Sequence, residues 1–430
     1  MTALLSRLIR ASESPWAPGV LFLLALALRA VVAAATSDFT PGVEIWEYGQ
    51  QATCAAQHAR DLCLWDGARQ PYISALMPPL TSYLWLGLFA AFGMGAAPHV
   101  VYVSLNVLMG AACTPLLYKL AREIGLERGP ACLAGLIITG YPTFVFVSAG
   151  YHATNFTVAL MLSFLILLVR VARDFDWKAA LAAGLVGGLA ALTRNELLVI
   201  AAAATLLVLW LGRKHLAIAL QAAAALTLGV GLVTAPWIAR NYIAFHSFIP
   251  IGAQAGYNVW IGFGPYARGS GNQLDNDPEA RAAAAVVREG VAPGDPPESR
   301  FEPRLQRAFL DDAQPALREG GLGRIAGLTA QRLTLLWIFD WTDPITRSPG
   351  YWLPWLVAHA LALWGVIMVW RKRASIEPNA GAFITLFLVV FTLAYSVSSI
   401  FVRYRMHMEP FIFLFAAIGA WSVLARWKRD

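Results

Sequence analysis

Long apolar runs recur along this chain and are separated by short polar segments. A membrane-spanning helix needs about 20 mainly apolar residues to cross about 30 Å of hydrocarbon, and most of these runs approach that length. The pattern therefore predicts an all-α polytopic membrane protein with about ten transmembrane helices. The expected spans are residues 17–36, 100–120, 131–148, 155–171, 179–193, 197–211, 216–237, 352–370, 381–400 and 410–427.

The composition supports this assignment. Hydrophobic residues make up 58% of the 430 positions and charged residues 14%, and the mean hydropathy is +0.57. A chain this apolar is not a soluble globular protein. We therefore expect membrane lipids as partners, and we expect no nucleic-acid partner.

One more apolar segment, residues 78–94, gives an eleventh span if it crosses the membrane. The positive-inside rule separates the two counts, because lysines and arginines concentrate in cytoplasmic loops. With ten crossings every basic cluster falls on one side and both termini are cytoplasmic, whereas with eleven the first cluster falls opposite the others. We therefore expect ten crossings, and residues 78–94 as an amphipathic interface helix that begins at the Pro78–Pro79 pair. The clusters are Arg7/Arg10, Lys119/Arg122/Arg128, Arg170/Arg173/Lys178, Arg213/Lys214, Arg371/Lys372/Arg373 and Arg426/Lys428/Arg429.

The first span has a second interpretation. Arg7 and Arg10 precede an apolar run that ends in three alanines at 33–35, which is also the pattern of a cleaved signal peptide. The run is long for a signal, so we favour a span. In both cases the chain after Asp38 lies outside, in the periplasm.

This topology divides the chain into three parts. Residues 1–238 form an N-terminal membrane module that includes a first periplasmic loop, 37–98. Residues 239–351 form a second periplasmic loop with short helices, and residues 352–430 hold the C-terminal membrane helices. No feature indicates an independent soluble domain. The short helices are expected at 304–318 and 322–339.

Two cysteines of the first outer loop, Cys54 and Cys63, lie in a compartment that allows disulfides. Their spacing would place them about 13 Å apart on a straight helix, so a bridge requires a turn between them. The sequence leaves a bridged and an unbridged loop equally open. It shows no metal-ligand spacing and no P-loop.

Four arginines lie at the ends of apolar spans, on the face where positive charge is normally scarce: Arg194, Arg240, Arg403 and Arg405. Guanidinium groups bind phosphate through two hydrogen bonds, stay charged and tolerate partial burial. Several of them at one membrane face therefore indicate a lipid phosphate or pyrophosphate. The alternative, snorkelling to lipid headgroups, explains one such arginine better than four. Arg29 lies inside the first span, where a charge indicates either a functional site or snorkelling towards the interface.

Three acids follow the first span: Asp38, Glu44 and Glu47. A carboxylate beside an apolar cleft can take the proton of an acceptor hydroxyl or hold a divalent cation. The alternative is a solvated loop, in which acids are common.

The order of these features resembles the GT-C superfamily of integral membrane glycosyltransferases. The closest resemblance is to the bacterial branch with the aminoarabinose, protein O-mannosyl and lipopolysaccharide-core galacturonosyl transferases. Nearly the whole chain takes part. The motifs are Glu47-Tyr48-Gly49 and Ala52, Met77-Pro78-Pro79-Leu80, Pro236-Trp237 followed by Arg240-Asn241, Gly256-Tyr257-Asn258-Val259-Trp260-Ile261-Gly262, and Arg403-Tyr404-Arg405 ahead of Glu409-Pro410.

The resemblance implies an inverting glycosyltransferase of the hexosyl or pentosyl type. Such an enzyme of the cell inner membrane moves a sugar from a polyprenyl-phosphate donor to a lipid or cell-envelope glycan acceptor, such as lipopolysaccharide, at the periplasmic face. The four arginines become candidates for binding the donor phosphate, and the three acids become candidates for the base. A divalent cation is compatible with this chemistry, and no other cofactor is expected. The substrate cleft would include Tyr48, Pro78, Pro79, Asn241, Tyr257, Asn258, Trp260 and Tyr404. The Gly-spaced aromatic loop Gly252–Gly264 is as consistent with packing as with stacking on a sugar ring.

Two departures from the family pattern matter. The adjacent Asp-Glu pair of many members is missing here, so the identity of the base stays open. A large C-terminal soluble domain of the oligosaccharyltransferase kind is also missing, which argues against transfer to sequons of folded proteins. The competing interpretations are a polyprenyl-phosphate-sugar flippase or transporter without catalysis, and an inactive scaffold of the same fold.

Overall fold

The computed structural model describes residues 12–58, 60–66, 69–271, 276–291, 301–372, 374–398 and 400–427. Of the predicted basic clusters, Arg7, Arg10, Arg373, Lys428 and Arg429 lie outside this part of the chain. Its α-helices are α2 (Ala17–Thr36), α3 (Trp46–His58), α4 (Pro79–Phe92), α5 (Ala96–Glu123), α6 (Arg128–Gly140), α7 (Pro142–Phe146), α8 (Thr154–Asp174), α9 (Trp177–Ala191), α10 (Asn195–Leu211), α11 (Leu216–Phe245), α12 (Ala255–Phe263), α14 (Pro278–Gly290), α15 (Phe301–Trp337), α16 (Pro349–Trp370), α17 (Pro378–Ser396) and α18 (Glu409–Trp427). Two short strands, β1 (Cys63–Trp65) and β2 (Pro71–Ile73), pair antiparallel.

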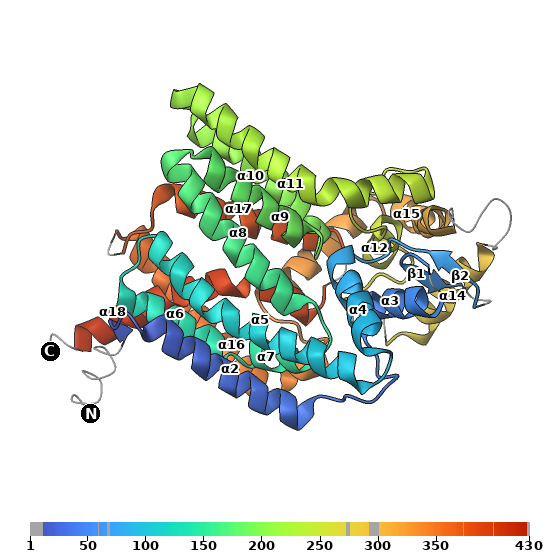
Figure 1. The fold of residues 1–430 in the computed structure, drawn as a ribbon, viewed down its shortest axis with the longest axis horizontal. Coiled ribbons are helices and arrows are strands. Elements are labelled where there is room, and N and C mark those ends of the chain that lie inside the picture. Colours follow the sequence, from blue (N-terminus) through green and yellow to red (C-terminus); the bar gives the residue numbers. More distant parts are fainter. Residues whose placement is uncertain are drawn as a thin grey trace.

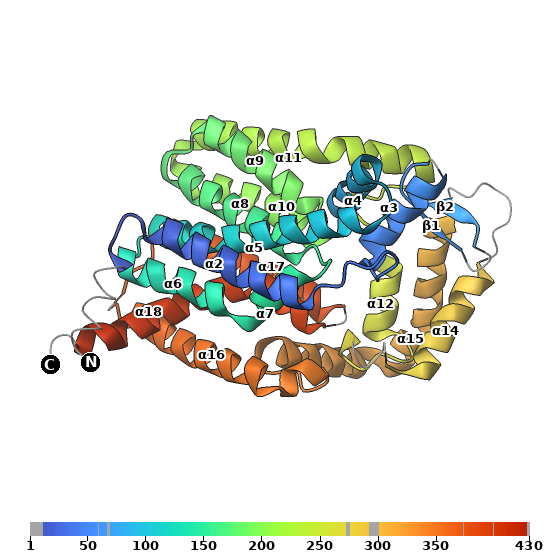
Figure 2. The ribbon, with the colours of Figure 1, turned by 60° about the horizontal axis from the view of Figure 1, so that its bottom comes forward.

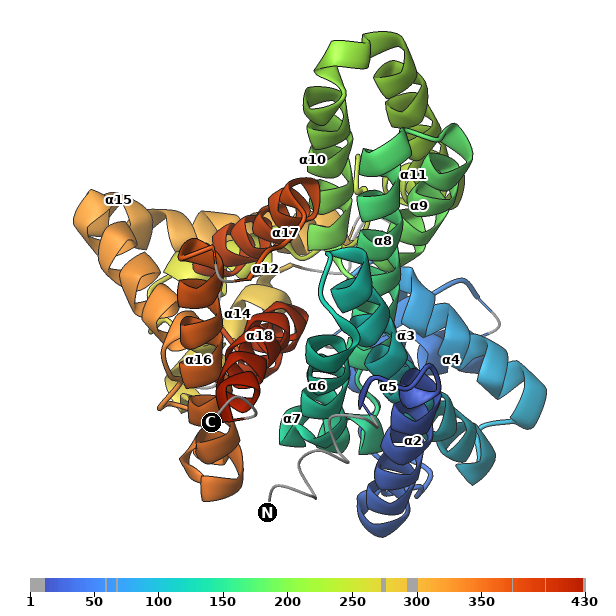
Figure 3. The same cartoon turned by 90° about the vertical axis from the view of Figure 1, so that its left-hand side faces the viewer.

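Most helices run along the long axis of the molecule (Figure 1). The start of α2 and the end of α18 lie at one end of this axis (Figures 1 and 2). At the other end, which we call the loop end, α3, α4, α12, α14 and the β1–β2 hairpin gather. Viewed along the axis, α9, α10 and α11 form one lobe, and α16 pairs with α18 on another side of the bundle (Figure 3).

The expected spans are present as helices. Within the described residues, six helices are long and apolar enough to cross a membrane, namely α2, α5, α8, α11, α16 and α17; the pair α6–α7, bent by 59°, brings the number to seven if it counts as one broken span. Three shorter apolar helices, α9, α10 and α18, occupy the other expected spans. The expected interface segment is α4, which begins at Pro79 with Pro78 as its N-cap. The chain is thus a multi-pass membrane protein.

Close backbone contacts hold α16 against α18. A Cβ on Gly365 would overlap the carbonyl of Phe415, and a Cβ on Gly419 would overlap the carbonyl of Leu361. Lipid tails are as apolar as leucine side chains, so helices in a bilayer associate through close packing rather than through burial from water. These two glycines therefore permit the contact between the last span and α16.

A buried arginine closes the bend between α6 and α7. The helix breaks before Pro142, so the last carbonyls of α6 lose their helical donors at membrane depth. Arg29 of α2 supplies donors from its two terminal nitrogens, which lie 3.0 and 3.1 Å from the carbonyls of Ile138 and Thr139. The Arg29 side chain is fully buried. It therefore caps a broken helix and does not snorkel to the interface.

We expect the substitution Arg29→Met to lower the free energy of unfolding by about 2 kcal/mol. Two buried carbonyls lose a charged donor, and this outweighs the relief of removing one buried charge. Thermal unfolding in detergent, followed by tryptophan fluorescence, measures the effect. Leu28→Met is the control, because Leu28 precedes Arg29 on the same helix and is 37% exposed. Equal stability of the two variants would contradict the capping role.

One segment of the second outer loop differs from expectation: the predicted aromatic loop Gly252–Gly264 contains the helix α12. The two predicted short helices are confirmed, because α15 consists of two helical segments that meet at a kink at the non-helical residue Gly321. Gly321 has a φ of 56°, a left-handed conformation that glycine adopts at little cost. α12 packs against α15, so the loop becomes helical where its apolar face finds a partner.

Candidate active site at the loop end

Two of the four predicted arginines meet around one tyrosine ring. Arg194 directly precedes α10, and Arg403 lies in a short 3-10 helix, η5 (Val402–His407). Their guanidinium carbons lie 4.8 and 5.8 Å from the ring centre of Tyr404. We call Arg194 and Arg403 the arginine pair. The fold thus brings together two cations that are far apart in the sequence.

The arginine pair has few competing partners. Arg194 faces Glu196 at 3.5 Å, and within the described ranges no carboxylate lies within 4 Å of the Arg403 guanidinium. In the same part of the chain, the buried Nε of Arg403 has no hydrogen-bond partner. Instead, Arg403 stacks on the rings of Trp46 and Phe401, at 5.1 and 4.3 Å. The pair is therefore a preformed cationic site that retains donors for a ligand.

The first turn of α3 lies against the arginine pair. Trp46, which contacts Arg403, begins this turn, and Tyr48 is buried in it. Burial raises the pKa of Tyr48 to about 12, while Arg194 and Arg403 oppose part of that rise. The charge of Glu47 also acts on the Tyr48 hydroxyl. At neutral pH this hydroxyl therefore keeps its proton and can donate a hydrogen bond.

Two histidines line the same region. His152 makes edge-to-face contacts with the rings of Trp46 and Tyr48, at centroid distances of 5.5 and 6.1 Å. His407 lies in η5 and is fully buried. Burial lowers the pKa of both histidines well below its usual value, and the nearby Arg194 lowers it further. Both imidazoles are therefore neutral and leave the positive charge to the arginine pair.

The three predicted acids are all exposed but differ in their surroundings. Oδ1 of Asp38 accepts hydrogen bonds from the amide and hydroxyl of Thr40, at 2.9 and 2.6 Å, and these bonds lower its pKa. Glu44 precedes α3. Glu47 occupies the first turn of α3, and its charge acts on Tyr48. Of the three acids, Glu47 is the one that the fold places next to the residues that surround the arginine pair.

Arg405 contacts a different set of residues, although it follows Arg403 by two positions. It is buried, and its terminal nitrogens bind the Tyr351 hydroxyl at 3.3 Å and the Leu335 carbonyl at 2.8 Å. Arg405 therefore ties η5 to α15 and α16. None of these contacts involves the arginine pair.

Arg240 and Asn241 also have other partners. Nε of Arg240 donates to Asp61 at 2.6 Å. Asn241 is buried and donates to the Ile249 carbonyl at 2.9 Å. The structure therefore brings together two of the four predicted phosphate arginines and gives the other two separate partners.

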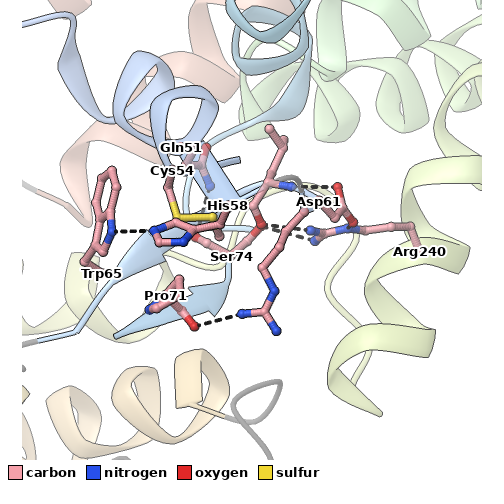
Figure 4. The surroundings of a disulfide bond; sticks show 11 residues. Gln51, Cys54, His58, Asp61, Trp65, Pro71, Ser74 and Arg240 are labelled. Carbon is pink, nitrogen blue, oxygen red and sulfur yellow. Dashed lines mark hydrogen bonds and ion pairs between the residues drawn. A yellow bond between two sulfur atoms is a disulfide. The ribbon is translucent and has the colours of Figure 1, made fainter. Parts of the chain in front are cut away.

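The Cys54–Cys63 disulfide is present (Figure 4). α3 ends at His58, and the chain then reverses into β1, which brings the two Cα atoms to 5.5 Å. This reversal is the turn that a bridge required, and it settles the alternative that the spacing left open. The bond joins the end of α3 to the β1–β2 hairpin.

The predicted aromatic cleft residues lie in a packed core. Trp260 is 2% exposed, and its indole N–H donates to Asp312 at 2.7 Å. The Tyr257 ring stacks on it at 6.1 Å, and the Asn258 amide bonds to the Gln254 carbonyl at 2.8 Å. The hydrogen bond from Trp260 to Asp312 joins α12 to α15. Within the described residues, no group of three or more His, Cys, Asp or Glu side chains is placed to hold a metal ion.

Sequence reasoning gave no role to several residues around the arginine pair. The Tyr395 ring lies 5.6 Å from the Arg194 guanidinium carbon, although Tyr395 reads as an ordinary residue near the end of a span. His152, His407 and Trp46 also carry no motif of their own. The only local signal in the sequence was that Trp46 directly precedes Glu47. The other residues contact the arginine pair from segments that are distant in sequence, so no local pattern indicates their role.

Comparison with protein families finds one match. A family model described as dolichyl-phosphate-mannose-protein mannosyltransferase matches residues 77–239, which is less than half of the chain. No curated protein matches. The matched segment runs from just before α4 into the last part of α11, ends one residue before Arg240, and includes Arg194.

Solved structures share the fold. The archaeal oligosaccharyltransferase AglB from Archaeoglobus fulgidus, in complex with an inhibitory peptide and a dolichol-phosphate, aligns with a TM-score of 0.55 and 13% identity, covering 96% of this chain and 51% of the archaeal one. The apo form of the A. fulgidus oligosaccharyltransferase gives 0.50 and 12%, with the same coverage. This chain thus spans about half the length of that enzyme. ArnT from Cupriavidus metallidurans, bound to undecaprenyl phosphate, aligns at only 0.41 with 16% identity, over 95% of this chain and 78% of ArnT.

Proposed function

We propose that this chain, which has the GT-C fold of integral membrane glycosyltransferases, transfers a sugar from a polyprenyl-phosphate donor to a lipid or cell-envelope glycan acceptor. The observation that carries the proposal is the arginine pair around Tyr404. A matching family model described by a dolichyl-phosphate-mannose donor supports it, as does a fold shared with an enzyme whose structure is a complex with a dolichol-phosphate.

The arginine pair suits a phosphate group in particular. Arg403 carries a buried Nε without a partner in the described residues, and in the same residues the ion pair of Arg194 is a 3.5 Å contact with Glu196. The histidines beside the pair are neutral and add no positive charge that would compete for the ligand. Two guanidinium groups can donate to several oxygens of one phosphate, with each bond stronger than a neutral one. Aromatic rings around them exclude water and strengthen the interaction.

The proposed reaction is an inverting displacement at the anomeric carbon. Glu47 takes the proton of the acceptor hydroxyl, and the acceptor oxygen forms a bond to the anomeric carbon. The bond from that carbon to the donor phosphate oxygen breaks, and polyprenyl phosphate leaves with the bonding electrons. Arg194 and Arg403 stabilise the negative charge that develops on the leaving phosphate. The protonated Tyr48 hydroxyl, on which both arginines act, donates a further hydrogen bond to the oxygens of this phosphate.

We place the reaction at the periplasmic face of the cell inner membrane. Basic residues that the positive-inside rule assigns to the cytoplasm, such as Arg170 and Arg173 at the end of α8, lie at the opposite end of that helix from His152. A disulfide in the first loop is consistent with an oxidising compartment at the loop end. The sugar and acceptor of such an enzyme are cell-envelope components.

A transfer assay tests the proposal. The purified protein in lipid nanodiscs is incubated with radiolabelled undecaprenyl-phosphate sugars and with lipid and polysaccharide fractions of the cell envelope. We expect label to appear in one acceptor fraction, with release of an equal amount of undecaprenyl phosphate. In sealed vesicles, movement of labelled donor across the bilayer without transfer would overturn the proposal in favour of a flippase. Neither transfer nor movement would favour an inactive scaffold.

A further inference from the structure

Nearly every donor of the Arg240 side chain is already used within the protein (Figure 4). Nε binds Asp61 at 2.6 Å, one terminal nitrogen binds the carbonyl of Ser74 at 3.1 Å and the side chain of Asn241 at 3.0 Å, and the other binds the carbonyl of Leu62 at 3.2 Å. A guanidinium group has five N–H donors, so one remains. A phosphate could bind here through two hydrogen bonds only by displacing these partners.

The partners of Arg240 span the disulfide-linked hairpin. Leu62 immediately precedes β1 and Ser74 immediately follows β2, so a single guanidinium binds a carbonyl at the base of each strand. The same two residues also bond to each other, because the Ser74 amide donates to the Leu62 carbonyl at 2.9 Å. Asp61 extends the contact to α4, since its Oδ1 accepts from the Tyr83 hydroxyl at 3.1 Å. Arg240 thus fastens α11 to the hairpin and α4.

A buried hydrogen-bond chain continues from Ser74 into α3. The Gln51 amide nitrogen donates to the Ser74 hydroxyl at 3.0 Å, and Gln51 accepts from Ser82 of α4 at 3.0 Å. The Ser74 hydroxyl itself donates to Glu302 of α15 at 3.0 Å. All four of these side chains are buried. Gln51 lies one helical turn after Glu47. This series of hydrogen bonds therefore fixes the face of α3 that carries the candidate base.

We propose that Arg240 is a positioning residue: with Asp61 it fastens the disulfide-linked hairpin and so sets the place of α3, whose first turn carries Glu47 and Tyr48. The inference rests on the proposed function for its catalytic consequence, but the fastening itself is a property of the fold. It assigns Arg240 a role different from donor-phosphate binding. Loss of the fastening lets the base shift while the phosphate site stays intact.

Arg240→Ala and Arg240→Lys test this role, with Arg213→Ala as the matched control. Arg213 also stacks on a tryptophan three residues before it, at 4.6 Å compared with 4.7 Å for Arg240 and Trp237, but its hydrogen-bond partner is the Trp210 carbonyl near the end of α10. We expect kcat to fall by about 100-fold in both Arg240 variants, because a shift of about 1 Å in a catalytic group costs that much. The KM for the donor should change by less than about twofold. Lysine should not rescue kcat, since it lacks the planar fork that reaches four acceptors.

Two readouts are independent of sugar transfer. The first is the rate at which dithiothreitol reduces Cys54–Cys63, followed by thiol trapping, which we expect to rise about tenfold in Arg240→Ala and Asp61→Asn as the hairpin opens more often. The second is binding of undecaprenyl phosphate, which should stay unchanged in both. Combining the two substitutions should raise the reduction rate by less than the product of the two single effects, because both remove the same Arg240–Asp61 contact.

The outcomes separate this inference from the proposed function. Loss of undecaprenyl phosphate binding in Arg240→Ala, with the disulfide as protected as in the wild type, would overturn the positioning role and make Arg240 a phosphate ligand. Rescue of kcat by lysine would also overturn it. If the wild type shows no transfer, the proposed function fails, while faster reduction in both variants still supports the fastening of the hairpin.

Discussion

Replacing Arg194 or Arg403 by alanine will remove both donor binding and sugar transfer. Each substitution takes one cation from the arginine pair, and loss of one preorganised donor at a developing negative charge costs about 100- to 1000-fold in rate. Arg194→Lys should recover only part of this, because a lysine donates from a single point. The measurements are undecaprenyl phosphate affinity in nanodiscs and the initial rate of label transfer.

The matched control is Arg170→Ala. Arg170 pairs with Glu123 at 2.5 Å near the far end of α8, away from the loop end, so transfer should stay within about twofold of wild type. If Arg194→Ala and Arg403→Ala bind undecaprenyl phosphate as tightly as Arg170→Ala does, the arginine pair is not the phosphate site.

Replacing Glu47 by glutamine will abolish transfer while leaving donor binding intact. Loss of a general base costs about 100- to 10,000-fold. Asp38→Asn and Glu44→Gln should keep at least about one fifth of the wild-type rate. Asp38 is the weaker base, because the Thr40 hydrogen bonds that lower its pKa stabilise its ionised form. The transfer rate at saturating donor and the donor affinity are measured side by side for the three variants.

The reverse pattern would move the base to another acid. A large rate loss in Asp38→Asn, together with an active Glu47→Gln, would mean that the donor or acceptor binds on the Asp38 side of α3. Because glutamine and asparagine keep the size of the side chain, unchanged thermal unfolding should accompany all three substitutions.

The membrane architecture was predictable from the sequence because its cause is local. Each span is a continuous apolar run, and both the helical fold and the GT-C likeness were confirmed. The disulfide was left open, since spacing alone does not reveal whether the chain turns between Cys54 and Cys63. That turn depends on the β1–β2 pairing, which aligns Cys63 with Ile73.

The division among the arginines was not predictable, because all four carry the same local signal at a span end. The arginines differ in their partners, which are distant in sequence. Arg240 binds Asp61 and Ser74, Arg405 binds Leu335, and Arg194 contacts the ring of Tyr404. The partner of Trp260 is also distant in sequence. The aromatic loop left packing and a sugar contact equally open, and the structure shows that the Trp260 N–H donates to Asp312, 52 residues along the chain.

The capped bend between α6 and α7 has a consequence for biogenesis. Arg29 enters the bilayer with the first span, when the carbonyls of Ile138 and Thr139 have not yet been synthesised. An arginine near a helix centre opposes translocon-mediated insertion by about 2.5 to 3.5 kcal/mol. The first span therefore carries this unfavourable free energy of insertion until the third span has been synthesised and inserted. Insertion of this protein is cooperative between helices, and a chain truncated before residue 138 should leave its first span prone to slip out of the membrane.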